Sequence, residues 1–125
     1  MRQEFVIVCE SAIVAKDTGN LYILGIFENV SVPGVPVLQP KLVVVTRFSE
    51  ATGEHKHEIV IRHDSGIETA RLQGKINFGT NNKAQYIGTF IGLTFPKIGM
   101  YYIEIYADGI LQPMKGEFNV NIVHQ

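Results

Sequence analysis

Apolar and polar residues alternate most regularly near the C-terminal end of the chain. One face of residues 101–107 carries Tyr101, Ile103, Ile105 and Ala107, and the other carries Tyr102, Glu104 and Tyr106. A period of two residues is that of a β-strand. Asp108-Gly109 follows, a pair typical of tight hairpin turns because both positions tolerate positive φ. The return strand continues the apolar face with Phe118, Val120 and Ile122. We therefore predict a hairpin within residues 95–123.

The same alternation recurs along the rest of the chain, with turn residues between most of the segments. Apolar faces are Phe5, Ile7 and Cys9; Leu42, Val44, Thr46 and Phe48; Ile59 and Ile61 with His57 and His63; and Ala70, Leu72, Gly74, Ile76 and Phe78. About eight short strands with no helical periodicity are typical of a sandwich or a small barrel. We predict one all-β domain over residues 1–125. A sandwich is favoured because a stretch with three prolines, residues 32–40, suits a chain that switches sheets.

Residues 21–27 differ from the other segments because they are apolar on both faces. Their sequence is Leu-Tyr-Ile-Leu-Gly-Ile-Phe. Such a strand is either central and covered on both sides, or it lies under a contact between subunits. Both alternatives are open at this point.

An aromatic face is the candidate for binding. Residues 86–95 are predicted to place Tyr86, Gly88, Phe90 and Gly92 on their outward side, and residues 101–107 place Tyr102 and Tyr106 there. If these two strands pair, the outward surface collects Tyr86, Phe90, Tyr102 and Tyr106. The rings could cover neighbouring glycines, form a subunit contact, in which such residues are enriched, or provide a platform for a sugar or an extended peptide. We favour the subunit contact.

Composition narrows the classes of function. The formal net charge is -1 and no block of like charges occurs, so the chain lacks the basic footprint of a nucleic-acid binder. No apolar run reaches the length of a membrane span. A single cysteine, Cys9, cannot form an internal disulfide, which fits a reducing compartment, and we expect a cytoplasmic protein.

Candidate chemistry is sparse. His55 and His57 have the His-x-His spacing that puts two ligands on one strand face, but His63 lies too far along an extended strand to complete a site. They are weak metal candidates, and we expect no metal and no other cofactor. No nucleophile elbow, phosphate loop or dinucleotide fingerprint occurs. We therefore expect a protein that is not an enzyme.

Two resemblances accompany this interpretation. The spacing Gly99-x-Tyr101 at the start of a strand resembles the tyrosine corner of immunoglobulin-like sandwiches. That resemblance implies a buried Tyr101 ring whose hydroxyl bonds to the backbone. The segments Cys-Glu-Ser-Ala at residues 9–12, residues 20–27 and Phe95-Pro96-x-x-Gly99-x-Tyr101 together resemble a family of small, uncharacterised bacterial proteins. That family implies no activity and no site residues.

The sequence alone therefore predicts an interaction module of unknown role. Self-association as a dimer, or binding of another partner, is the leading hypothesis. The alternative is a carbohydrate- or peptide-binding module that uses the aromatic face.

Overall fold

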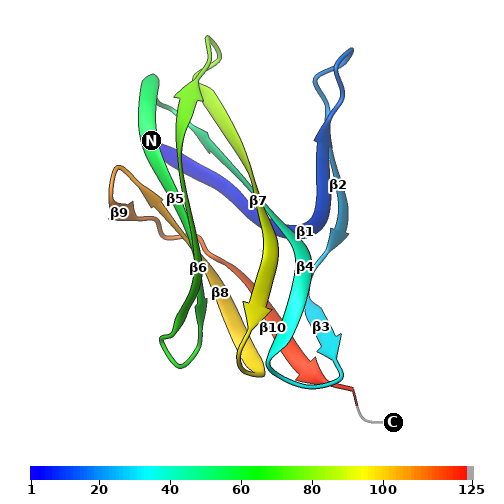
Figure 1. Ribbon diagram of the computed structural model, residues 1–125. Coiled ribbons are helices and arrows are strands. Elements are labelled where there is room, and N and C mark those ends of the chain that lie inside the picture. Colours follow the sequence, from blue (N-terminus) through cyan, green and yellow to red (C-terminus); the bar gives the residue numbers. More distant parts are fainter. Residues whose placement is uncertain (124–125) are drawn as a thin grey trace.

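The computed structural model describes residues 1–123 and shows an all-β protein (Figure 1). Its ten strands are β1 (Arg2–Val14), β2 (Leu21–Ile26), β3 (Asn29–Val32), β4 (Val37–Ser49), β5 (Gly53–His63), β6 (Glu68–Phe78), β7 (Lys83–Phe95), β8 (Gly99–Ala107), β9 (Ile110–Leu111) and β10 (Gly116–Ile122). Within residues 1–123, no helix is long and apolar enough to cross a membrane.

The strands form two sheets that pack face to face. Sheet A has the order β2-β1-β4-β7, and sheet B has the order β3-β10-β8-β5-β6, with β9 paired to β8. All pairs are antiparallel except β10 with β3. Within residues 1–123 no ladder joins the two sheets, so the predicted sandwich is confirmed and the sheets are not closed into a barrel. The chain passes from sheet B to sheet A between β3 and β4, where the proline-rich crossing was predicted. The loop is shorter than predicted, because β4 already begins at Val37.

The predicted C-terminal hairpin is present, with one extra element. Asp108 and Gly109 turn the chain with φ values of 50° and 79°. The turn leads first into β9, and β10 then pairs with the first half of β8, with Phe118 opposite Tyr101. The predicted return strand with Phe118, Val120 and Ile122 is β10, and residues 112–115 separate it from β9.

The core lies between the sheets and is centred on Tyr101. The ring is fully buried, stacks on Phe118 with centroids 5.4 Å apart, and contacts Phe95 at 5.1 Å. Its hydroxyl donates to the Lys97 carbonyl oxygen at 2.5 Å and accepts from the Lys97 amide at 3.2 Å. Both parts of the expectation for Tyr101 are confirmed. The hydroxyl bonds fix the corner that turns the chain from β7 into β8.

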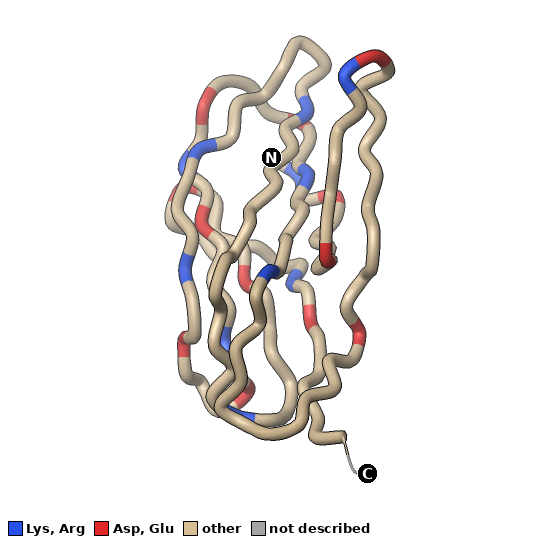
Figure 2. The backbone as a smooth tube through the Cα atoms, turned by 45° about the vertical axis from the view of Figure 1, so that its right-hand side comes forward, with Lys and Arg blue, Asp and Glu red and all other residues tan. Residues whose placement is uncertain are grey.

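A hairpin made of the second half of β1 and β2 stands apart from this core (Figures 1 and 2). β1 pairs with β4 from Arg2 to Cys9 and with β2 from Cys9 to Val14, so Cys9 is the point at which β1 passes from one partner to the other. We call residues 10–26 the β1–β2 hairpin. Beyond Cys9, β1 pairs with β2 along one edge, and no other strand within residues 1–123 pairs with its second edge.

Candidate functional site

The four residues of the predicted aromatic face do not share a surface. Tyr102 and Tyr106 lie half-buried on the outer face of sheet B, on the side opposite the buried Tyr101. Tyr86 and Phe90 lie on β7, which is in sheet A, and both pack against the core between the sheets. β7 and β8 do not pair with each other. The prediction of one face holding all four rings was therefore wrong.

The error arises at Gly92, which has a φ of 70°. The β4–β7 ladder pairs Gln39 with Leu93 and Lys41 with Ile91, but it skips Pro40 and Gly92, which lie between them. The side of β7 that faces the core changes at this skipped position. Phe90 is buried before it, Leu93 is buried after it, and Ile91 between them is 75% exposed. A strict period of two places Leu93 and Phe90 on opposite faces, but the irregularity puts both in the core.

Tyr86 covers two glycines, as one of the three alternatives for the aromatic residues predicted. A Cβ atom added at Gly74 would lie 2.7 Å from the Tyr86 hydroxyl, and one added at Gly88 would lie 3.1 Å from its ring. Gly74 belongs to β6 in sheet B and Gly88 to β7 in sheet A. The Tyr86 ring therefore fills the space that both glycines leave, where the two sheets meet.

The two weak metal candidates have separate partners. The two ring nitrogens of His55 bond to Asp108 Oδ2 at 2.6 Å and to the Thr52 carbonyl oxygen at 2.9 Å. His57 is fully buried, and its Nε2 lies 3.0 Å from Thr46 Oγ1. Among the described residues, no three His, Cys, Asp or Glu side chains form a group suited to a metal ion.

Burial and hydrogen bonding move the pKa values of these two histidines in opposite directions. Both partners of His55 are acceptors, so both of its nitrogens donate, and the hydrogen bond to Asp108 raises its pKa. Burial lowers the pKa of His57 to about 4, and its Nδ1 atom has no hydrogen-bond partner among the described residues. His57 is therefore a neutral core side chain near neutral pH.

Cys9 is not placed for nucleophilic chemistry. Its side chain is buried with Val43 and Val45 on the outer side of sheet A, where Phe5 and Ile7 pack against it. Burial raises the pKa of the thiol, and a reactive cysteine needs the opposite shift. The predicted role as a small apolar residue on the same face as Phe5 and Ile7 agrees with this arrangement.

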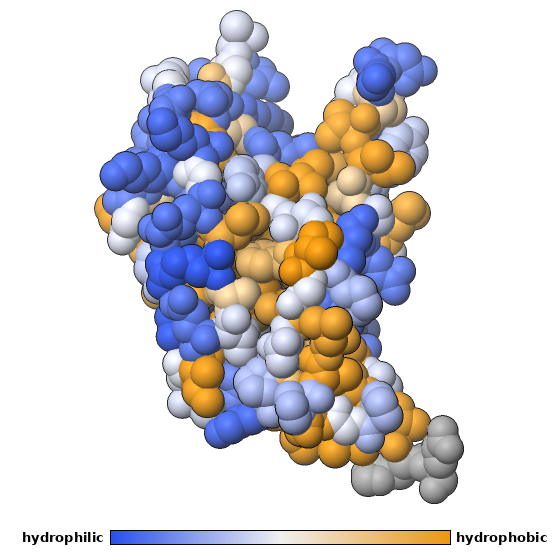
Figure 3. All heavy atoms as spheres, in the orientation of Figure 1, coloured by the Kyte–Doolittle hydropathy of each residue, from blue (hydrophilic) through white to orange (hydrophobic). Residues whose placement is uncertain are grey.

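A group of exposed apolar side chains lies on the β1–β2 hairpin. Five of its side chains are between 44% and 62% exposed: Ile13, Val14, Tyr22, Leu24 and Ile26. Hydrophobic residues gather on this hairpin and on the adjoining part of the molecule, whereas the left-hand part of the view, where β5, β6 and β9 lie, is mostly hydrophilic (Figure 3). β2 is also an edge strand of sheet A. The first alternative for residues 21–27, a covered central strand, is therefore wrong.

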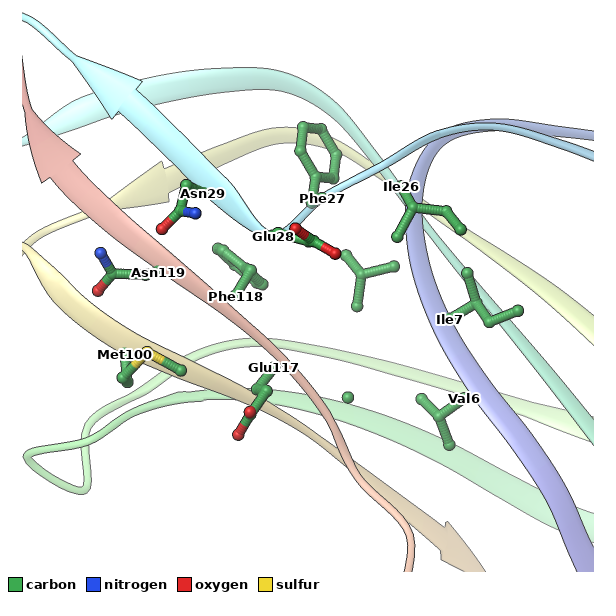
Figure 4. Close-up of a pocket in the computed structure, with 12 residues that line it drawn as sticks. Val6, Ile7, Ile26, Phe27, Glu28, Asn29, Met100, Glu117, Phe118 and Asn119 are labelled. Carbon is green, nitrogen blue, oxygen red and sulfur yellow. The ribbon is translucent and has the colours of Figure 1, made fainter.

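A groove along the side of the sandwich is the second candidate, which the sequence did not indicate. It has a volume of about 530 Å³ and lies where β1 of sheet A faces β10 of sheet B (Figure 4). Its lining is Val6, Ile7, Val8, Ile26, Phe27, Glu28, Asn29, Met100, Gly116, Glu117, Phe118 and Asn119. The residues come from four distant parts of the chain, and no local motif marks them.

Two hydrogen-bonded links join the walls of this groove. The side-chain amide of Gln3 donates to the Met114 carbonyl oxygen at 2.8 Å and accepts from the Met114 amide at 2.7 Å. Gln3 thus takes the place of a strand partner for the segment before β10. At the other link the Asn119 amide donates to the Glu28 carbonyl oxygen at 2.9 Å. The walls also approach closely at Gly116, where an added Cβ would lie 3.1 Å from Val8 Cγ2.

Comparison with known proteins supplies a family and no activity. No curated protein matches the chain. A family model described as a family of unknown function, DUF6941, matches residues 4–121. The matched range includes the β1–β2 hairpin, the groove and the Tyr101 corner. The chain therefore belongs to DUF6941, a family of unknown function.

Proposed function

We propose that this chain is a non-catalytic module that associates with a second copy of itself through the β1–β2 hairpin. The observation that supports the proposal is the exposed apolar surface on an edge strand. Tyr22, Leu24 and Ile26 are each more than half exposed. A long apolar edge strand with free backbone groups is a template for pairing with another chain, and exposed apolar patches mark contact sites.

A second copy is the partner that fits this edge. The six residues of β2 carry no charge, so they offer little to an electrostatically steered partner and match an uncharged strand like themselves. In an antiparallel pair about a two-fold axis, the turn of one hairpin lies beside the far end of the other β2. The two-fold relation is the commonest symmetry of soluble oligomers.

The rival surface is the outer face of sheet B, where Tyr102 and Tyr106 lie. Arg62 pairs there with Glu104 at 2.9 Å, and Arg71 pairs with Glu58 and Glu68. Lys115 Nζ lies over the Tyr102 ring, 4.2 Å from its centroid. A sugar or a subunit that stacked on this ring would have to displace the ammonium group. These contacts favour the hairpin over the tyrosines as the site of association.

Sedimentation equilibrium on three proteins tests the proposal. The parent is expected to dimerise at tens of micromolar, a concentration that corresponds to roughly 6–7 kcal/mol of association free energy. A Tyr22→Glu/Leu24→Glu variant is expected to be monomeric, because each carboxylate would be buried in the apolar contact. The matched control is Tyr102→Glu/Tyr106→Glu, which is expected to dimerise like the parent.

A monomeric parent at that concentration would overturn self-association. Loss of the dimer in the tyrosine variant alone would move the contact to sheet B and restore the aromatic surface as the association site. Circular dichroism of each variant checks that the sandwich is intact, so that an unfolded variant is not counted as a monomer.

Three further assignments belong with this proposal. The immunoglobulin-like kind of sandwich is supported by the Tyr101 corner at the start of β8. A cytoplasmic setting is supported by a lone cysteine whose thiol is buried among apolar side chains. A bacterial source stays a prediction.

A further inference from the structure

The groove between the sheets is bordered by strand edges that have no partner. The Val8 carbonyl oxygen accepts a hydrogen bond from the Phe27 amide, so the main-chain groups of Val8 point away from β4. Alternate residues of a strand direct N–H and C=O to the same side, so those of Val6 point to this side too. β2 begins to pair with β1 only at Cys9. The edge of β1 at Val6 is therefore open to a further strand.

The opposite wall has a similar gap. β10 pairs with β8 from Gly116 to Val120, but β3 covers the other edge of β10 only from Asn119 onward. Gly116, Glu117 and Phe118 line the groove at the uncovered part. Between residues 1 and 123, no ladder joins β1 to β10. An extended chain that enters here meets uncovered strand edges on both walls.

The side chains around the groove combine an apolar floor with an acidic rim. Val8 and Phe118 are buried, and Val6 and Phe27 pack beside them. Glu28 and Glu117 are exposed and are drawn at the groove in Figure 4. Neither carboxylate forms an ion pair within the described residues, and the lining contains no lysine, arginine or histidine. The groove therefore complements a ligand that is apolar in part and positively charged in part.

We propose that this groove binds an extended peptide segment that carries apolar side chains and a lysine or arginine, and that adds as a strand to β1 at Val6. Successive side chains of a strand point to opposite sides. An apolar side chain of the peptide can lie on the floor formed by Val8 and Phe118 while its basic neighbour reaches Glu117 or Glu28. Main-chain pairing supplies affinity for any extended segment, and the side chains supply the selectivity.

The test begins with selection from a phage-displayed library of random heptapeptides on the immobilised full-length chain. The selected sequences are expected to contain β-branched or aromatic residues together with lysine or arginine. A fluorescein-labelled synthetic peptide of the consensus sequence is then titrated by fluorescence polarisation. Glu117→Lys is expected to weaken binding at least tenfold. Glu54→Lys is the matched control, since Glu54 is an exposed glutamate outside the groove, and it is expected to leave binding unchanged.

A second peptide separates strand addition from simple charge attraction. Methylation of one backbone nitrogen in the centre of the peptide, scanned over two successive positions, removes a donor without changing the charge. One of the two methylated peptides is expected to lose binding, because alternate amides face β1. Equal binding by both would overturn strand addition. Failure to enrich any sequence, enrichment of acidic peptides, or equal binding to Glu117→Lys and to the parent would overturn the proposed site.

The outcome can be separated from that of the proposed dimer, although Ile26 belongs both to the hairpin surface and to the groove lining. The titration is repeated on the Tyr22→Glu/Leu24→Glu variant, whose substitutions lie outside the groove lining. Retained peptide binding by a monomer would keep the groove and the dimer contact as separate sites. Retained dimerisation by Glu117→Lys, together with loss of peptide binding, would also show that the groove and the dimer contact are separate sites.

Discussion

The sandwich has two sides at which an edge of sheet A lies next to an edge of sheet B. The two sides are built differently. On the side where β6 turns into β7, which we call the closed side, Tyr86 of sheet A lies against Gly74 of sheet B. On the side where β1 faces β10, which we call the open side, the groove separates the walls, and the Gln3 side chain links them. One side is filled by an aromatic ring over glycines, and the other is joined by polar bonds beside a hollow.

The difference indicates which part of the molecule serves stability and which is free to bind. Close packing of Tyr86 over its glycines on the closed side makes small changes of volume costly. The open side contains unpaired edges and unpaired carboxylates, features that tight folding alone does not require. Binding sites on a rigid scaffold are commonly of this second kind. The predictions below test the contrast, from the largest expected effect to the smallest.

The largest effect is expected at Tyr101, beneath the open side. Its ring stacks on Phe118, which lines the groove. Tyr101→Ala is expected to lower the free energy of unfolding by about 3–5 kcal/mol, the range for loss of a buried aromatic ring. Tyr101→Phe, which removes the hydroxyl bonds to Lys97 alone, is expected to cost about 1 kcal/mol. Urea unfolding measures both.

The control for Tyr101 is its neighbour Tyr102, which lies on the outer face of sheet B. Tyr102→Ala is expected to cost about 1 kcal/mol or less, because most of its contacts are at the surface. Equal losses at the two positions would contradict the assignment of the buried and outer faces of β8.

The second prediction concerns acid and the closed side, where His57 lies beside Tyr86 with ring centroids 4.5 Å apart. Burial lowers the pKa of His57 to about 4, whereas in the unfolded chain it is about 6.5. Below pH 6.5 the His57 imidazole is protonated in the unfolded state but stays neutral in the folded state. Stability is therefore lost as the pH falls from 6.5 towards 4, by about 2–3 kcal/mol at pH 4.5.

The measurement is urea unfolding at pH 7 and pH 4.5 on the parent and on His57→Gln. The variant is expected to lack this part of the pH dependence, whatever its stability at pH 7. An unchanged pH dependence would contradict a neutral, buried His57.

The His55–Asp108 pair acts in the opposite sense for the histidine, because the raised pKa of His55 gives stability that is present below pH 6.5 and lost at higher pH. His55→Gln measures that contribution separately.

The third prediction compares one glycine from each side. A Cβ added at Gly88 would lie 2.7 Å from Ile59 Cδ1 and 2.9 Å from Leu72 Cδ2. Gly88→Ala is expected to cost about 1–3 kcal/mol by overpacking. At Gly116 the nearest atoms are at 3.1 and 3.3 Å, and the open side can widen by a few tenths of an ångström. Gly116→Ala is therefore expected to cost less. The reverse order in urea unfolding would contradict the distinction between a closed and an open side.

Alternation along the sequence was sufficient to predict most of the fold. Strand faces followed directly where the ladder is regular, as for Tyr101, Ile103 and Ile105, which are all fully buried. The Asp108-Gly109 turn was predictable because its chemistry is local. The outward face of β7 was not predictable, because the irregular position at Gly92 reverses which side of the strand is buried. The residues before Gly92 contain no signal of this reversal.

The candidate sites were less predictable than the fold, for a different reason. The apolar residues 21–27 correctly drew attention to an unusual strand, but pattern alone could not distinguish a central strand from an exposed edge. The groove joins Val6, Phe27, Met100 and Phe118, which only the sheet order brings together. Sequence periodicity reports which way a residue points and not which strands become neighbours.

The smallest effect is expected at Gln3, the polar link of the open side. Gln3 is only 6% exposed, and its amide makes both bonds to Met114. Gln3→Ala is expected to cost about 1–2 kcal/mol, because it leaves the main chain of Met114 partly unpaired. Gln112→Ala is the matched control, since that amide bonds only to the nearby Ile110 carbonyl oxygen on the exposed surface. Hydrogen exchange is the sharper measurement. Faster exchange in Gln3→Ala should appear at Met114 and along β10, while β5 and β6 on the closed side keep their protection. Equal acceleration on both sides would mean that Gln3 stabilises the sandwich as a whole rather than linking the walls of the groove.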